Sequence, residues 1–83
     1  MKKHRHDFVD AYDGLVAFGM DRETDENTIK YYLQKFSDDD LMAALVPRLD
    51  DGELTALFDM MSGLMRRHLV EDEYHDLFLK EHG

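Results

Sequence analysis

The 83-residue chain contains no cysteine and no tryptophan, and it has one proline and five glycines. The lack of cysteine excludes disulfide scaffolds, thiolate zinc sites, iron–sulfur clusters and cysteine nucleophiles. The glycines stand apart at positions 14, 19, 52, 63 and 83, so the chain has no glycine-rich phosphate loop. These absences remove several large classes of enzyme and metalloprotein.

Hydroxyl nucleophiles are scarce as well. The two serines, Ser37 and Ser62, both lie outside the Gly-x-Ser-x-Gly turn that is typical of hydrolases. Carboxylates are numerous, but a helical domain of this size offers little room for a deep pocket in which a pair of them could act. We therefore expect a protein that is not an enzyme and that has no catalytic residues and no cofactor.

Basic residues are few, since ten Lys and Arg stand against 19 Asp and Glu and the formal net charge is −9. Such a balance opposes binding to a phosphate backbone, so we expect no nucleic-acid partner. The basic residues gather in two places. Residues 1–6 resemble a flexible basic tail, and Arg66-Arg67 fall where a helix C-terminus favours positive charge.

Long apolar runs are absent too. The longest extends over six residues, from Leu41 to Val46, which is far too short to cross a membrane. The segment after Arg5 is interrupted by aspartates and lacks the apolar stretch of a secretory signal. The prediction is a cytoplasmic protein without a membrane partner.

The apolar residues that are present recur at helical spacing, and β-branched residues are rare. This pattern predicts an all-α fold, a compact bundle of about five short helices that forms a single domain over residues 1–83. The first expected helix covers about residues 7–19. The second is capped by Thr24 or Asp25 and ends at about residue 36. The other three cover about residues 38–46, 51–69 and 71–80.

Local signals predict where these helices begin and end. Gly19 is expected to stop the first helix, and Ser37 to cap the third, which Pro47 should end by about Val46. Asp50 with Glu53 three residues later has the spacing of a capping box for the fourth helix.

The same periodicity predicts which side of each helix is buried. In the second helix Ile29, Tyr32, Leu33 and Phe36 share the expected core face, and Tyr31 points almost opposite to them. The segment between residues 41 and 46 is apolar all round, so we expect it to be buried on several sides.

The predicted helix 51–69 has an apolar stripe that Met60 widens to about half of the helix circumference. A stripe of this width indicates either a central helix wrapped by the others or a face shared with a second chain. We favour the second alternative, a homodimer through residues 51–69. The stripe itself consists of Leu54, Leu57, Phe58, Met61, Leu64, Met65 and Leu69.

One group of residues could bind a metal. His68, Glu71, Asp72 and His75 lie within eight residues, and imidazole with carboxylate suits zinc or iron. The motifs of di-iron bundles and zinc peptidases are missing, however. His68 can bond the last carbonyls of its helix and Asp72 can cap the next one, so we expect no metal here and keep the site as an alternative.

The function predicted from these features is that of a non-catalytic protein-interaction or regulatory module. Its partner is expected to be another protein with a basic surface, because the acidic faces require one. The residues expected to make the contact are Tyr31, Met60 and Leu79, apolar groups that lie off the main faces of their helices. Two alternatives remain: a metal-binding protein that uses His68 and His75, and an acidic DNA-mimic inhibitor.

Overall fold

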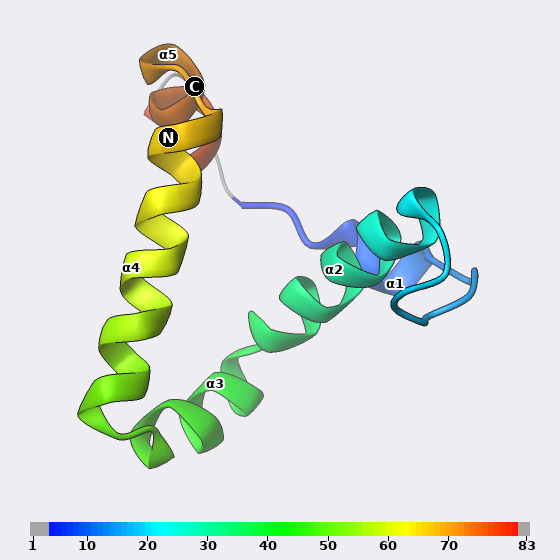
Figure 1. Cartoon of the computed structure of the whole chain (residues 1–83), viewed down its shortest axis with the longest axis horizontal. Helices are drawn as coiled ribbons and strands as arrows, with labels where there is room; N and C mark the ends of the chain where they lie inside the picture. The colour runs from blue at the N-terminus through cyan, green and yellow to red at the C-terminus, as the bar shows by residue number, and fades with distance from the viewer. Residues whose placement is uncertain (1–3, 82–83) are drawn as a thin grey trace. The chain divides into compact units, whose positions relative to one another are not determined.

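The computed structural model describes residues 4–81, and these residues form helices joined by short links, with no β-strand (Figure 1). The all-α prediction is confirmed. None of the described helices is long and apolar enough to cross a membrane. The helices are α1 (Asp7–Ala11), α2 (Arg22–Phe36), α3 (Asp39–Leu45), a 3₁₀ turn (Val46–Arg48), α4 (Asp51–His68), α5 (Glu71–Glu73) and a π-helical turn (Tyr74–Phe78).

The chain divides into two compact units. The N-terminal unit, Arg5–Arg48, contains α1, α2 and α3, and the C-terminal unit includes residues 49–81 with α4 and α5. Residues 1–3 of the predicted basic tail lie outside the described residues. Within the remainder of that tail, Arg5 forms an exposed ion pair with Asp7 at 3.3 Å.

Helix α1 ends at Ala11, so the prediction that it extends to about residue 19 is wrong. The backbone of Tyr12 is extended, and its hydroxyl donates a hydrogen bond to the carbonyl oxygen of Leu15 at 2.7 Å. Its ring covers Gly14 so closely that a Cβ there would lie 2.6 Å from the hydroxyl oxygen. This fold-back requires glycine and replaces a helix that glycine would weaken. Gly19 has the expected positive φ of 91°, but it lies in a loop.

Helix α2 is capped by Asp21, and not by Thr24 or Asp25 as predicted. Asp21 has extended backbone angles, and its carboxylate accepts from the backbone N–H of Thr24 at 2.8 Å and from the Thr24 hydroxyl at 3.0 Å. These bonds lower the pKa of Asp21 below its ordinary value of 3.8, because both favour the charged carboxylate. Asp25 instead accepts from the N–H of Gly19 at 2.8 Å and fixes the preceding loop.

Helix α3 is capped by Asp38, whose carboxylate accepts from the N–H of Leu41 at 3.0 Å. The predicted cap, Ser37, turns back and donates its hydroxyl to the carbonyl of Gln34, so it closes α2 instead. The helix ends beside Pro47 as expected. Its apolar residues are not buried, because within the N-terminal unit α3 contacts mainly the 3₁₀ turn that follows it and, to a smaller extent, α2. Leu41, Met42 and Val46 keep 39–43% of their surface exposed.

Helix α4 confirms its prediction to within one residue. The N–H of Glu53 donates to the Asp50 carboxylate at 2.8 Å, and the N–H of Asp50 donates to the Glu53 carboxylate at 2.9 Å. This reciprocal capping box fixes the first turn. The helix then continues for 18 residues, which corresponds to a length of about 27 Å.

The last helical segment begins at Glu71 as expected, but its cap residue differs from the prediction and it ends in a wider turn. Val70 is the cap residue, and its N–H donates to the Glu73 carboxylate at 2.9 Å, so Asp72 is not the cap. From Tyr74 the helix widens to π geometry, in which the N–H of Leu79 bonds the carbonyl of Tyr74 at 3.0 Å. The turn therefore ends at Phe78, before the predicted limit.

Candidate interaction surface

Helix α1 and the loop after it are attached to one side of α2 by hydrogen bonds. The N–H of Val9 donates to the side-chain oxygen of Gln34 at 2.7 Å. The hydroxyl of Thr28 donates to the carbonyl of Ala17 at 2.7 Å and accepts from the Ala17 N–H at 3.1 Å. Thr28 is only 4% exposed. Within the N-terminal unit, α1 and its loop lie against α2 (Figure 1). The hydrogen bonds of Thr28 and Gln34 place them on its polar side.

Aromatic rings continue this contact. The ring of Tyr12 stacks on Phe8 with centroids 5.0 Å apart, and it lies 6.1 Å from the ring of Tyr31 at a tilted angle. The ammonium groups of Lys30 and Lys35 lie over Phe8 and Tyr31, at 5.6 and 5.2 Å from the ring centroids. Tyr31 is therefore half-buried, and not the exposed residue that its position opposite the apolar face suggests.

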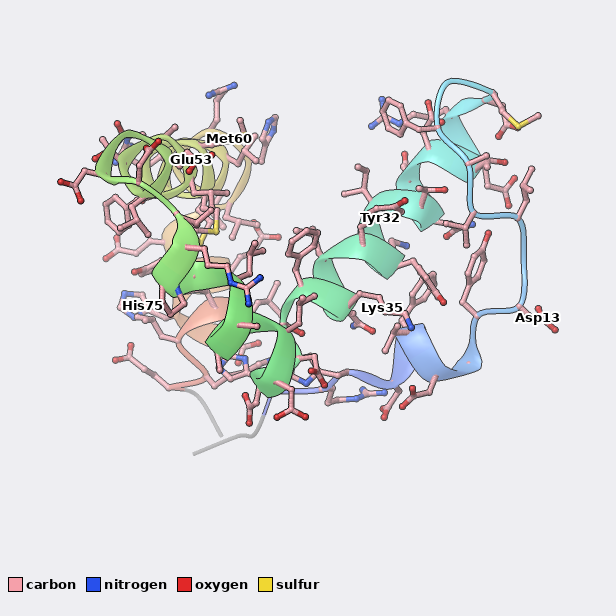
Figure 2. All side chains as sticks on the ribbon, turned by 90° about the horizontal axis from the view of Figure 1, so that it is seen from below. Asp13, Tyr32, Lys35, Glu53, Met60 and His75 are labelled. Carbon is pink, nitrogen blue, oxygen red and sulfur yellow. The ribbon has the colours of Figure 1, made fainter. Side chains whose placement is uncertain are left out.

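The apolar face of α2 is the side that remains uncovered. Ile29, Tyr32, Leu33 and Phe36 keep between 46% and 62% of their surface exposed (Tyr32 is labelled in Figure 2). The prediction that this face is buried is wrong, because α1 and its loop bind the opposite side through Thr28, Tyr31 and Gln34 rather than through an apolar stripe. An amphipathic helix whose apolar side faces solvent is typical of a binding surface.

A groove of about 650 Å³ lies in the same unit, between α1 and the junction of α2 with α3. Three carboxylates line it, from Asp10, Asp38 and Asp39, and Lys35 and His6 also reach it. The carboxylates give the groove an acidic wall beside the first turn of α3, whose helix dipole favours them there. The groove suits a basic side chain better than an acidic one.

In the C-terminal unit the apolar stripe of α4 is exposed along most of its length. Leu54, Leu57, Phe58, Met61 and Leu64 keep 42–66% of their surface, and Met65 and Leu69 are half-buried. Met60 is 64% exposed at the margin of this stripe, on the same side of α4 as Glu53 (Figure 2). No other helix of the described unit packs along α4.

The other predicted contact residue, Leu79, is half-buried where the π-helical turn ends. Beside it the rings of Tyr74 and Phe78 stack with centroids 5.4 Å apart. Leu77 and Phe78 are about half exposed, so Leu79, which is predicted to lie off the main face of its helix, is more buried than either of them. The wider π turn changes the angle between successive side chains and so shifts them around the axis.

The four residues of the alternative metal site do not form one. Among residues 4–81, no three His, Asp or Glu side chains come together in a way that could hold a metal ion. His75 instead lies between two carboxylates: its Nδ1 bonds Glu81, and its Nε2 lies 3.6 Å from Glu71. The bond to Glu81 raises the pKa of His75 above its ordinary value of 6.5, partial burial opposes this rise, and Glu71 adds to it.

Sequence reasoning misses the residues that hold the N-terminal unit together. Thr28 and Gln34 are polar, and an apolar-periodicity argument assigns them to the solvent side of α2. Their positions six residues apart, with Tyr31 midway, do place all three on one helix face. That spacing is a signal that a second, polar contact surface exists.

No protein-family model matches the chain, and no curated protein and no solved structure matches it either. What the chain does must therefore follow from its own residues.

Proposed function

We propose that this chain is a non-catalytic protein-interaction or regulatory module of the cytoplasm. It binds another protein through the apolar face of α2, and the acidic groove between α1 and the junction of α2 with α3 selects a partner with a basic surface. The observation that carries this proposal is the uncovered face itself. Four large side chains, Ile29, Tyr32, Leu33 and Phe36, form a contiguous stripe that the rest of its unit does not cover.

Leaving such a stripe in contact with water is energetically unfavourable. Burying a large apolar side chain contributes roughly 1.5–3 kcal/mol relative to leaving it in water. A partner that covers Tyr32, Leu33 and Phe36 therefore gains a compact apolar centre, which is where binding energy concentrates in protein interfaces. The acidic wall at Asp38 and Asp39 then supplies orientation and a faster encounter with a basic partner.

The alternatives have weaker support. A metal-binding function would need more ligands than His75 and the two carboxylates that already hold it, and the described residues offer no such group. A DNA-mimic inhibitor also requires an acidic surface, but it needs no exposed apolar stripe. The stripe favours a partner protein with mixed apolar and basic character.

The test is affinity purification of the full chain from its own cells, with a matched pair of variants. Leu33→Asp puts a charge in the middle of the α2 face, and Met20→Asp makes the same change at an exposed loop position outside it. We expect a basic protein to co-purify with the wild type and with Met20→Asp, and its recovery to fall at least severalfold with Leu33→Asp. Helix content by circular dichroism should stay the same in all three.

Two results would count against the proposal. Equal recovery with both variants would remove the α2 face from the contact. A partner whose binding is unaffected by salt would remove the acidic groove, since screening weakens attraction between exposed charges. Competition of the complex by added DNA would favour the DNA-mimic alternative instead.

A further inference from the structure

Helix α4 offers a second uncovered face, and its sequence is complementary to itself. The apolar positions are spaced evenly about the middle of the helix. If two copies of α4 lie antiparallel with their midpoints together, position 54 falls opposite position 65 and position 58 opposite position 61. Leu54 then meets Met65 and Phe58 meets Met61, once on each side of the two-fold axis, and Leu57 of one copy lies within two residues of the level of Leu64 of the other.

The charges of α4 follow the same symmetry. The first turn carries Asp51 and Glu53, and the last turn carries Arg66, Arg67 and His68. At about 100° per residue, Asp51 and Arg66 fall along one edge of the apolar stripe, and Glu53 and Arg67 fall along the other. In an antiparallel pair each edge meets the same edge of its partner.

The acidic end of one copy consequently lies beside the basic end of the other, on both edges and at both ends of the pair. Opposite charges at both edges select the orientation. The two helix dipoles also oppose each other, which favours the same arrangement. A parallel pair would place acid beside acid and base beside base.

We infer that α4 pairs antiparallel with α4 of a second copy of this chain, through the stripe of Leu54, Phe58, Met61 and Met65. The inference deepens the proposed function, on which it rests, because it takes exposed apolar helix faces to be binding surfaces. It assigns the two faces different occupants: the α2 face binds another protein, and the α4 face binds a second copy. A two-fold axis near the middle of α4 makes the interface self-complementary and closed.

The test is disulfide exchange in the full chain, which has no cysteine of its own to interfere. Leu54→Cys and Met65→Cys are prepared separately, mixed and equilibrated in a glutathione buffer. In the antiparallel pair these two positions face each other, whereas position 54 of one copy lies about 16 Å along the axis from position 54 of the other. We expect the mixed disulfide to exceed each homodisulfide by about tenfold or more, because pairing raises the effective concentration of the two thiols.

The matched control is the pair Ala56→Cys and Gly63→Cys. In the antiparallel pair these two positions also lie at the same level along the helix axis, but they are on the back of α4, away from the partner. Their mixed disulfide should therefore form only in the proportion expected from random pairing of the two variants. A Cβ at position 63 meets nothing closer than 3.5 Å, so the substitution fits the fold. Sedimentation of the wild-type chain, expected to give a dimer, accompanies the exchange experiment.

Homodisulfides of Leu54→Cys in excess would indicate a parallel pair and overturn the inference. A wild-type chain that sediments as a monomer, with no preference in the exchange, would overturn it as well. Neither result bears on the proposal for the α2 face. If Leu33→Asp still abolishes partner recovery and Met20→Asp does not, the proposed function stands without the dimer. Failure of the α2 test together with a mixed disulfide on α4 would support the dimer and overturn the proposed function.

Discussion

At the scale of single residues, Thr28 attaches the loop before α2 to the helix. Its hydroxyl both donates to and accepts from the backbone of Ala17, and it is the buried polar residue on which the loop before α2 depends. Replacing it with the isosteric valine leaves the N–H and the carbonyl of Ala17 without these bonds. We expect Thr28→Val to lower the free energy of unfolding by about 1–3 kcal/mol.

Urea unfolding followed by circular dichroism measures this change, and hydrogen exchange of the Ala17 amide reports whether the loop is released. Thr28→Ser is the control, because it keeps the hydroxyl and should retain most of the stability. A valine variant with wild-type stability and unchanged exchange at Ala17 would mean that the loop is held by other contacts.

His75 gives a pH-dependent prediction. The bond to Glu81 raises the pKa of His75, so the folded protein binds a proton more tightly than the unfolded chain. The resulting contribution to stability is fully present below the ordinary pKa of 6.5 and is lost as the pH rises through the higher folded value. Titration of the His75 ring protons by NMR should give a pKa above 6.5, and Glu81→Gln should lower it.

Glu71→Gln provides the comparison, because Glu71 lies farther from the ring, at 3.6 Å from Nε2. Its effect on the pKa of His75 should have the same sign and be smaller. An unshifted His75 in the wild-type chain would show that the Glu81 contact does not persist in solution.

Some of these residue-scale features can be predicted from the sequence and others cannot. Asp50 and Glu53 are found because a capping box needs only local spacing. Ser37 is assigned to the wrong helix end, because Asp38 is an equally good cap one residue later. In the fold-back, the ring of Tyr12 lies over Gly14, and no local sequence pattern predicts the position of that ring.

At the scale of helices, α4 is the element whose local signals agree best. Asp50→Ala removes the carboxylate that accepts from the N–H of Glu53 at 2.8 Å, and with it half of the capping box. We expect a loss of about 1 kcal/mol in the free energy of unfolding, with fraying of the first turn. Asp50→Ser keeps an acceptor at the cap and should be nearly neutral.

Chemical denaturation measures the two variants, and amide exchange at Glu53 and Leu54 localises the effect. Equal stability of the alanine and serine variants would show that solvent replaces the cap at no cost. Protection that is lost only at the first turn in Asp50→Ala would agree with the hydrogen bonds of the structure.

The helices also show where periodicity stops being informative. The period of the apolar residues correctly groups Ile29, Leu33 and Phe36 on one face of α2. It does not say which face its neighbours cover, and here α1 covers the polar one through Thr28 and Gln34. Hydrogen bonds between distant segments decide that choice, and these depend on tertiary arrangement rather than on local spacing.

At the scale of the whole molecule, charge and apolar surface act together. None of the described apolar residues is buried, and the formal net charge is −9. Exposed apolar stripes promote association, while a large net charge of one sign opposes it. Association of two copies is therefore favoured only where the local charges are opposite, and the two ends of α4 provide that arrangement.

Charge reversal at one end of α4 tests this balance. Arg66→Glu with Arg67→Glu makes both ends of the helix acidic, so that an antiparallel pair brings like charges together at each end. We expect the dimer dissociation constant to rise by about tenfold at low salt, and by less at high salt where exposed charges are screened. Sedimentation equilibrium at two ionic strengths measures both values.

The complementary variant, Asp51→Lys with Glu53→Lys, makes both ends basic and should also dimerise more weakly than the wild type. Glu53→Lys removes the Glu53 half of the capping box as well, and circular dichroism of this variant measures that loss separately. Mixed one to one, the two variants place opposite charges together at every end, so a heterodimer should form more tightly than either homodimer. The substitutions lie at the edges of the apolar stripe and leave the residues within it unchanged. Two variants that both dimerise like the wild type would mean that the apolar stripe alone holds the pair, and the charges would then have no part in choosing its orientation.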